Sequence, residues 1–218
     1  MSKYKGILES RADAAQRLMD VIPMQKLRDE QWITVAVSKG GLALGSLIAS
    51  KYATPLELLF MSAIMAPNNP ECEVARVSET QEIVINEKLV NSFEIKYDYI
   101  YGEAHRKHEE DILSHIYQYR KGRPFPSMNK EVVLLIDDAS ETGSRFLTAL
   151  KSILAQKPRA VYIAVPVLPT DVLELLEPFV DEIYCLYDID DFVETELYYE
   201  ELEKIDDEEI EKLLEENR

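Results

Sequence analysis

The sequence has few cysteines and no long apolar run, and each of these shortages excludes a class of protein. Its 218 residues include only two cysteines, Cys72 and Cys185, which lie far apart. Neither a disulfide framework nor a zinc site of clustered cysteines is therefore expected. No apolar stretch approaches the roughly 20 residues that cross a bilayer, and the first residues lack the apolar core of a secretory signal. We expect no membrane partner and a cytoplasmic location.

Positive charge is also scarce. The chain has 24 Lys and Arg residues against 41 Asp and Glu residues, which gives a formal net charge of −17. Because nonspecific binding of nucleic acid requires a basic surface, no nucleic-acid partner is expected. Residues 188–218 hold 15 of the acidic residues and only 3 basic ones. The rest of the chain is mildly acidic and is not expected to repel an anionic substrate strongly.

The remaining composition is that of a globular protein, with 46% hydrophobic and 30% charged residues. Short apolar runs that suit buried strands alternate with amphipathic helical patterns, which is typical of a parallel sheet with right-handed crossovers. We predict an α/β fold with a parallel sheet of about five strands and helices on both faces. The predicted strands are 33–37, 55–60, 132–136, 160–165 and 182–186. Residues 1–218 are expected to form one domain, with a helical N-terminal addition and an acidic C-terminal extension at 188–218.

The most informative stretch runs from Glu131 to Leu150 and reads EVVLLIDDASETGSRFLTAL. Val132–Ile136 suits a strand that is buried on both faces. Asp137 and Asp138 follow at its carboxyl end, the edge at which open α/β sheets bind ligands. The next residues form a small polar turn that opens into an amphipathic helix, and such a helix start offers N–H groups to an anion. Two carboxylates beside an anion site suit a diol, and a phosphate next to a diol is a ribose 5-phosphate.

A second turn of this kind follows the first predicted strand. Ser38, Lys39, Gly40 and Gly41 separate that strand from a predicted helix at 42–52. Adjacent glycines let the backbone approach a ligand closely and adopt positive φ. Two anion turns, each at the carboxyl end of a buried strand, match one sugar that carries both a 5-phosphate and a 1-diphosphate. The strands 33–37 and 132–136 are therefore expected to be neighbours.

Two further segments have recognisable patterns. Val74–Val77 and Ile83–Ile85 flank a polar turn and predict a hairpin. Residues 101–120 predict a charged helix that carries all three histidines, His105, His108 and His115. A metal site on these histidines is one interpretation, but the neighbouring basic residues favour a solvated helix face.

The central stretch resembles the phosphoribosyl diphosphate (PRPP) signature of the type I phosphoribosyltransferases. In that family a hydrophobic strand ends in two acidic residues, here Asp137 and Asp138, and the loop closes in Thr-Gly, here Thr142 and Gly143. The order of motifs is most similar to a bacterial group of phosphoribosyltransferase-like proteins. These share the APNNPE segment at 66–71, the hairpin over the site and the later Asn-Glu pair. The sequence departs from the family in having Arg145 where threonine is usual, and from the bacterial group in having Ser62-Ala63 where Arg-Lys is usual.

The resemblance implies a role for each residue of the two turns. Asp137 and Asp138 would hold the ribose hydroxyls and, directly or through water, Mg²⁺. Glu141 would act with them in catalysis as a general base or by orienting the acceptor, although a carboxylate that only solvates the loop fits equally well. The loop that wraps the 5-phosphate would consist of Ala139, Ser140, Glu141, Thr142, Gly143, Ser144 and Arg145. The loop that contacts the diphosphate would consist of Ser38, Lys39, Gly40 and Gly41.

The function implied is that of a phosphoribosyltransferase, a glycosyltransferase of nucleotide metabolism. It would transfer ribose 5-phosphate between PRPP and an unidentified nucleobase-like acceptor, with release of diphosphate. The alternative is a regulatory protein that binds PRPP or a nucleotide without turnover, which the two departures motivate. A P-loop NTPase is excluded because the sequence lacks the G-x-x-x-x-G-K-[ST] motif. A homodimer is compatible with the family but is not indicated by any residue.

Overall fold

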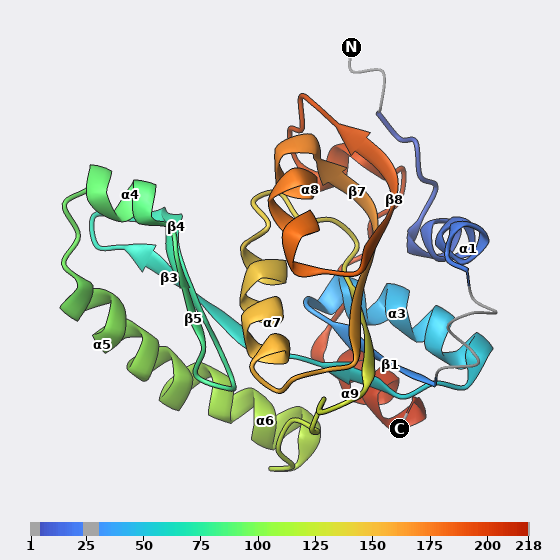
Figure 1. Ribbon diagram of the computed structural model, residues 1–218, viewed down its shortest axis with the longest axis horizontal. Coiled ribbons are helices and arrows are strands. Elements are labelled where there is room, and N and C mark those ends of the chain that lie inside the picture. Colours follow the sequence, from blue (N-terminus) through green and yellow to red (C-terminus); the bar gives the residue numbers. More distant parts are fainter. Residues whose placement is uncertain (1–4, 24–30, 218) are drawn as a thin grey trace.

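The computed structural model describes residues 5–23 and 31–217, and its centre is a five-stranded parallel sheet (Figure 1). The strand order is β2-β1-β6-β7-β8. Ile33 pairs with Val133 in parallel, so the predicted neighbours are confirmed together with the α/β class. The strands are β1 Trp32–Ala36, β2 Leu56–Leu58, β6 Val132–Ile136, β7 Ala160–Pro169 and β8 Glu182–Ile189.

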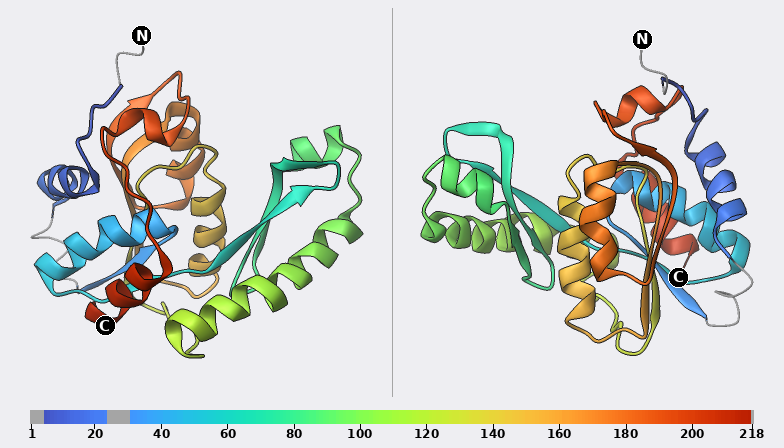
Figure 2. Two further views of the ribbon diagram at one scale, coloured as in Figure 1. Left: turned by 180° about the vertical axis from the view of Figure 1, so that it is seen from behind. Right: turned by 45° about the horizontal axis from the view of Figure 1, so that its top comes forward.

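Helices cover both faces of this sheet, as Figures 1 and 2 show. The side chains of β6 alternate between two apolar cores: Leu134 belongs to one, and Val133 and Leu135 belong to the other. Every residue of β6 is buried, which explains why its sequence is continuously apolar rather than alternating. The helices are α1 Arg11–Val21, α3 Lys39–Tyr52 and α9 Asp207–Glu216 in the first core, and α7 Ser144–Leu154 and α8 Thr170–Leu176 in the second.

Residues 61–120 form an arm that projects from the body of the molecule (Figure 2). It consists of a three-stranded antiparallel sheet, in the order β3-β4-β5, covered by a long helical segment. The hairpin predicted from the sequence is confirmed, whereas β3 was not predicted as a strand. The elements are β3 Met61–Ala66, β4 Asn69–Ser78, β5 Ile83–Ile85, α4 Glu87–Ser92, α5 Tyr97–Lys107, a π-helical turn His108–Ile112 and α6 Leu113–Arg120.

A buried ion pair at the base of the arm contacts the body through Phe60. Arg120, at the end of α6, has a side chain only 1% exposed and pairs with Glu79, just after β4, whose side chain is 3% exposed. The Arg120 guanidinium also lies 4.8 Å from the ring centre of Phe60. Glu79 in turn accepts a hydrogen bond of 2.9 Å from the Phe60 amide. Because breaking a buried pair leaves an uncompensated charge, this joint restrains the arm's base.

The helix of the arm differs from its prediction. It begins at Tyr97 rather than at residue 101, and two of its histidines are not on a solvated face. His108 is buried, with Nε2 3.2 Å from the Glu79 carbonyl oxygen, and the ring of His115 packs on Phe60. No cluster of metal-ligating side chains occurs among the described residues.

The residues that precede α1 pair with the segment of the chain that leads from β8 to α9. Leu8 pairs in parallel with Tyr199, and the Glu200 amide donates to the Leu8 carbonyl at 2.8 Å. We call residues 189–206, which include a 3-10 turn at Thr195–Tyr198, the covering segment. It leads to α9, whose first turn is acidic and whose N-terminus is capped by Asp206. Of the helices that the structure describes, none has the length and apolarity to span a bilayer.

Candidate functional site

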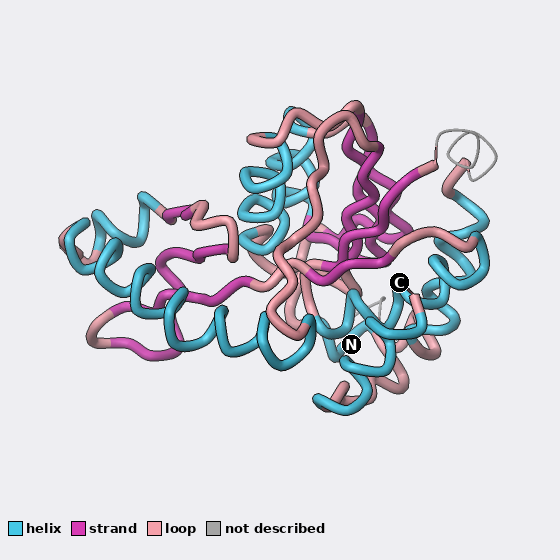
Figure 3. The backbone as a smooth tube through the Cα atoms, turned by 90° about the horizontal axis from the view of Figure 1, so that it is seen from below, coloured by secondary structure: helices cyan, strands magenta, loops and turns pink. Residues whose placement is uncertain are grey.

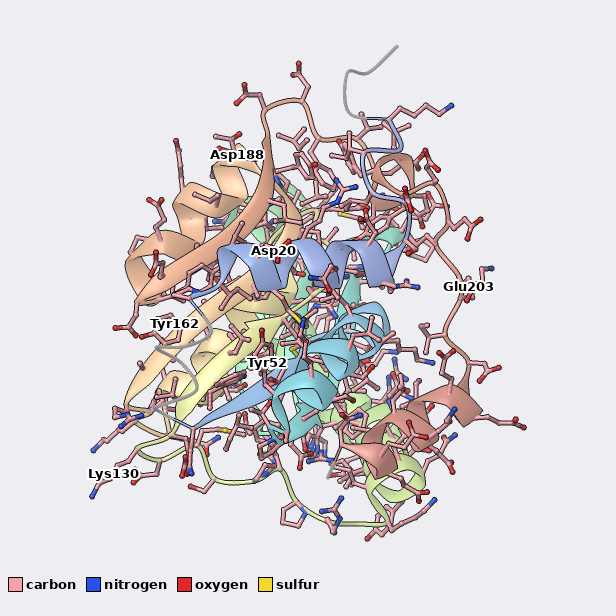
Figure 4. All side chains as sticks on the ribbon, turned by 90° about the vertical axis from the view of Figure 1, so that its right-hand side faces the viewer. Asp20, Tyr52, Lys130, Tyr162, Asp188 and Glu203 are labelled. Atoms are coloured by element: carbon pink, nitrogen blue, oxygen red, sulfur yellow. The ribbon has the colours of Figure 1, made fainter. Side chains whose placement is uncertain are left out.

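The two predicted anion turns lie side by side at the carboxyl edge of the sheet. Figure 4 labels the two ends of the sheet, with Asp188 at the carboxyl end of β8 and Lys130 just before β6. The Ser38 hydroxyl donates a hydrogen bond to Asp137 Oδ1, which joins the turn after β1 to the turn after β6. A Cβ atom on Gly40 would lie 1.9 Å from Asp138 Oδ2. The structure therefore brings the two predicted anion turns together with Asp137 and Asp138.

The turn after β1 is the start of a helix rather than a loop. Ser38 is the N-cap of α3, and its Oγ accepts a hydrogen bond of 2.8 Å from the Gly41 amide. Gly40 and Gly41 have helical geometry, so the expectation of positive φ is wrong. Their need for glycine comes from close packing, because a Cβ on Gly41 would lie 2.6 Å from the Ile136 carbonyl oxygen. No cis peptide bond occurs in the described parts of the chain.

Each carboxylate of the central motif is paired with its own arginine. Asp137 is completely buried, and its Oδ2 accepts from Arg145 Nε at 2.7 Å. Asp138 is 7% exposed and accepts from Arg11 Nε, in α1, at 2.9 Å. The repulsion expected between two adjacent aspartates is thus relieved by the protein itself.

Arg145 points into the loop that it closes. Besides the bond to Asp137, its guanidinium donates to the Ala139 carbonyl oxygen at 2.6 Å. A threonine at this position would be too short to bridge the two ends of the loop in this way. The departure from the family signature therefore has a structural role in this chain.

Burial dominates the electrostatics of Asp137. It raises the pKa of this carboxyl to about 7, while Arg145 opposes the rise and the neighbouring Asp138 adds to it. Between the ordinary aspartate pKa of about 4 and about 7, the folded chain binds more protons than the unfolded chain. The contribution of Asp137 to the free energy of unfolding is therefore largest below about pH 4 and is lost as the pH rises toward about 7.

We expect Asp137→Asn to flatten the pH dependence of stability in this window. The wild type should lose free energy of unfolding relative to the variant as the pH increases from about 4 to about 7, because only the wild type must ionise a buried carboxyl. Urea denaturation at several pH values measures both slopes. Identical slopes would show that Asp137 does not titrate in this range.

The loop between β6 and α7 is buried in its first residues and exposed in the next two. Ala139 and Ser140 are buried, whereas Glu141 and Thr142 are exposed. Gly143 has φ of +71°, and a Cβ atom there would lie 2.9 Å from Val172 Cγ1, so glycine is required on both grounds. α7 begins immediately afterwards and directs its N-terminal N–H groups toward the loop.

The covering segment and α1 contribute residues that the sequence analysis missed. The Tyr199 hydroxyl donates to the Asp138 carbonyl oxygen at 2.7 Å, and Arg11 also donates to the Glu203 carbonyl oxygen at 2.5 Å. Glu141 accepts from the Thr195 amide at 3.2 Å, so this candidate catalytic carboxylate is held against the covering segment. Nothing in the local sequence around these residues signals their position, because the contacts come from the two ends of the chain.

Lys39, in the turn after β1, is paired with the acidic tail. Its Nζ lies 3.1 Å from Asp207 Oδ1, at the start of α9, and the Tyr119 hydroxyl donates to the same carboxylate at 2.7 Å. Both charged side chains are more than half exposed, so the pair is weak and exchanges readily with a competing anion.

Three comparisons place this arrangement among known proteins. A scan against protein-family models finds no match. Two Mycobacterium tuberculosis proteins, each named "Putative phosphoribosyl transferase", are 22% identical over 180 residues, which cover 83% of this chain and 40% of each relative. The crystal structure of TT1426 from Thermus thermophilus superposes with a TM-score of 0.78 at 27% identity and covers 96% of this chain and 98% of that one.

More distant structures include a purine phosphoribosyltransferase from Pyrococcus horikoshii. It is 12% identical, covers 87% of this chain and 99% of its own, and has a TM-score of 0.43. The similarity to the curated relatives agrees with the resemblance drawn from Asp137, Asp138 and the Thr-Gly turn. This chain spans about two fifths of the length of those relatives.

Proposed function

We propose, from the resemblance of this chain to the type I phosphoribosyltransferases, that it binds PRPP and transfers ribose 5-phosphate between PRPP and a nucleobase-like acceptor. The single observation that carries this proposal is the meeting of two anion turns over one pair of carboxylates. Ser38 contacts Asp137, and Gly40 leaves the space that Asp138 occupies. A ribose that carries a 5-phosphate and a 1-diphosphate would place one anionic group on each of these two turns.

The two turns would have distinct tasks. The N–H groups of 139–145 and the start of α7 would hold the 5-phosphate, as helix N-termini commonly do. The turn Ser38–Gly41 would hold the diphosphate, with Lys39 leaving Asp207 for the anion. Asp138 would accept hydrogen bonds from the ribose hydroxyls. Asp137, whose two oxygens already accept from Ser38, Arg145 and the Asp138 amide, would instead fix the geometry of both turns.

The donor set also fits magnesium. Mg²⁺ is usually held by one or two carboxylates together with substrate phosphates. Asp138 is 7% exposed, whereas Asp137 is completely buried and both of its oxygens already accept hydrogen bonds, so Asp138 would hold the ion more directly. When bound, the ion would neutralise charge on the diphosphate leaving group.

The residues of the chain would act mainly by positioning and by charge stabilisation. Displacement of diphosphate from the anomeric carbon passes through a state with positive charge on the sugar. Asp138, close to the ribose, would stabilise that charge, and the amides of the first turn of α3 would stabilise the departing diphosphate. The covering segment and the arm border the site on two sides, so they would limit the access of water.

A hollow of about 520 Å³ beside Glu141 is a suitable place for the acceptor. Four carboxylates and one aromatic ring contribute to its lining, so it favours a planar acceptor that donates hydrogen bonds. Glu141 would orient this acceptor or take a proton from it. The lining residues are Glu141, Pro169, Thr170, Asp171, Glu174, Asp190, Phe192 and Val193.

The second candidate function is binding of PRPP or a nucleotide without turnover. It is motivated by the pairing of both central aspartates with arginines of the chain. The two candidates differ in one measurement. We expect isothermal titration to show one PRPP–magnesium complex bound per chain, and incubation of that complex with a panel of bases to release diphosphate. Binding without release on any base would favour the regulatory protein, and the absence of binding would contradict both.

A further inference from the structure

We propose that Arg76, on β4 of the arm, is a phosphate-binding residue of the loop 139–145, and that Glu73 holds it in place until the phosphate binds. This inference rests on the proposed function, since it concerns the same 5-phosphate. The arm would then be part of the binding site and not only a cover over it.

The position of Arg76 supports this role. Its Nε lies 3.3 Å from Ser144 Oγ, in the first residue of α7, and its side chain is only 14% exposed. β4 packs against α7, so the Arg76 guanidinium reaches the start of this helix from the arm. Figure 3 shows from below how the arm, at the left, joins the body of the molecule. A partly buried arginine beside the N-terminus of a helix places two positive features next to one anion site.

A β-bulge aims Glu73 at this arginine. Residues three apart in a regular strand point to opposite faces. In β4, however, Ile64 pairs with Ala75 while Met65 pairs with Glu73, so one residue is extra. The bulge returns Glu73 to the face of Arg76, and bulges near active sites commonly redirect side chains in this way.

The contact between Arg76 and Glu73 has the geometry with which arginine binds a phosphate. Arg76 donates to both carboxylate oxygens of Glu73, at 3.0 and 2.5 Å. Arginine binds phosphate with the same fork of two parallel hydrogen bonds. Glu73 is also near enough to Arg145 to add to the rise in its pKa that Asp137 causes. The negative charge of Glu73 therefore lies near both Arg76 and Arg145, and an arriving phosphate would compete with it for Arg76.

The test uses two probes, ribose 5-phosphate and inorganic diphosphate, titrated into the full chain. Arg76→Gln should weaken binding of ribose 5-phosphate by about 10- to 100-fold, the scale of a lost charged hydrogen bond, and leave diphosphate binding unchanged. Arg76→Lys should be intermediate, because it keeps the charge and loses the fork. Glu73→Gln should bind ribose 5-phosphate more tightly than the wild type, which a merely structural ion pair would not do.

Arg106→Gln is the matched control. Arg106 makes the same bidentate contact with a glutamate three residues before it, Glu103, but on α5, the outer helix of the arm (Figure 1). It should bind both probes like the wild type. Equal affinity of Arg76→Gln and wild type for ribose 5-phosphate would overturn the inference and leave the proposed function standing. Equal weakening for both probes would overturn the assignment to the 5-phosphate, and a wild type that binds neither probe would overturn both proposals.

Discussion

Asp138→Asn should weaken binding of the PRPP–magnesium complex by about 2–4 kcal/mol, the scale of a charged hydrogen bond lost at a desolvated site. The carboxylate lies at the carboxyl end of β6 and faces Gly40 in the other anion turn. Asparagine keeps the shape of the side chain but removes the charge and turns one acceptor into a donor. Isothermal titration of both proteins measures the difference.

The free energy of unfolding of Asp138→Asn shows whether Asp138 serves to bind the ligand or to stabilise the fold. From the sequence alone, removing one of two adjacent charges is expected to leave stability equal or slightly higher. The structure changes this expectation, because Asp138 accepts from Arg11. Asparagine can still accept that bond, so we expect a loss of only about 1 kcal/mol in the free energy of unfolding.

The control for Asp138→Asn is the same substitution at an exposed aspartate of α1. Asp20 lies on the exposed side of this helix (Figure 4), so Asp20→Asn removes the same charge without touching the site. It should change neither affinity nor stability appreciably. Unchanged affinity in Asp138→Asn would remove this residue from the ribose site, and a loss of stability as large as the loss of affinity would make it a structural cap.

Gly41→Ala should destabilise the fold by about 1–3 kcal/mol or more, the usual cost of overpacking. The added Cβ would lie 2.6 Å from the Ile136 carbonyl oxygen and 2.9 Å from the Asp137 Cα. Both are backbone atoms at the end of the central strand, so neither can move without separating α3 from β6. Binding of PRPP should be lost together with stability, because the two anion turns would move apart.

Gly102→Ala is the matched substitution for this experiment. Gly102 lies in α5, and a Cβ atom there would meet no atom within 4 Å. Alanine in a helix is favoured over glycine by about 1 kcal/mol, so this variant should be more stable than the wild type. Thermal or urea denaturation compares the two. A Gly41→Ala protein as stable as the wild type would show that the close contact between the turns is not required.

The central motif was predictable because its signals are local. A continuous apolar run fixes β6 as a buried strand, and two acidic residues with a Thr-Gly turn follow it directly in the sequence. The neighbouring positions of β1 and β6 could also be predicted, since the two turns must face one ligand. The first turn of α3 was misjudged because glycines permit both a loop and a tightly packed helix start, and only packing decides between them.

The partners of the central aspartates could not be predicted. Arg11 reaches Asp138 from a helix 127 positions earlier in the chain, and Tyr199 reaches it from the covering segment. Arg76 reaches the loop because the sheet of the arm packs against α7, and a bulge turns Glu73 toward it. Such contacts depend on how the ends of the chain and the arm fold over the sheet. The spacing of residues in the sequence does not predict them.

A crystal structure of the chain with ribose 5-phosphate and magnesium would test the proposed site most directly. We expect the phosphate within hydrogen-bond distance of the main-chain N–H groups of 139–145, with Arg76 turned toward it. The ribose hydroxyls should lie on Asp138. A ribose 5-phosphate bound elsewhere on the molecule, with the loop 139–145 empty, would contradict the proposed site.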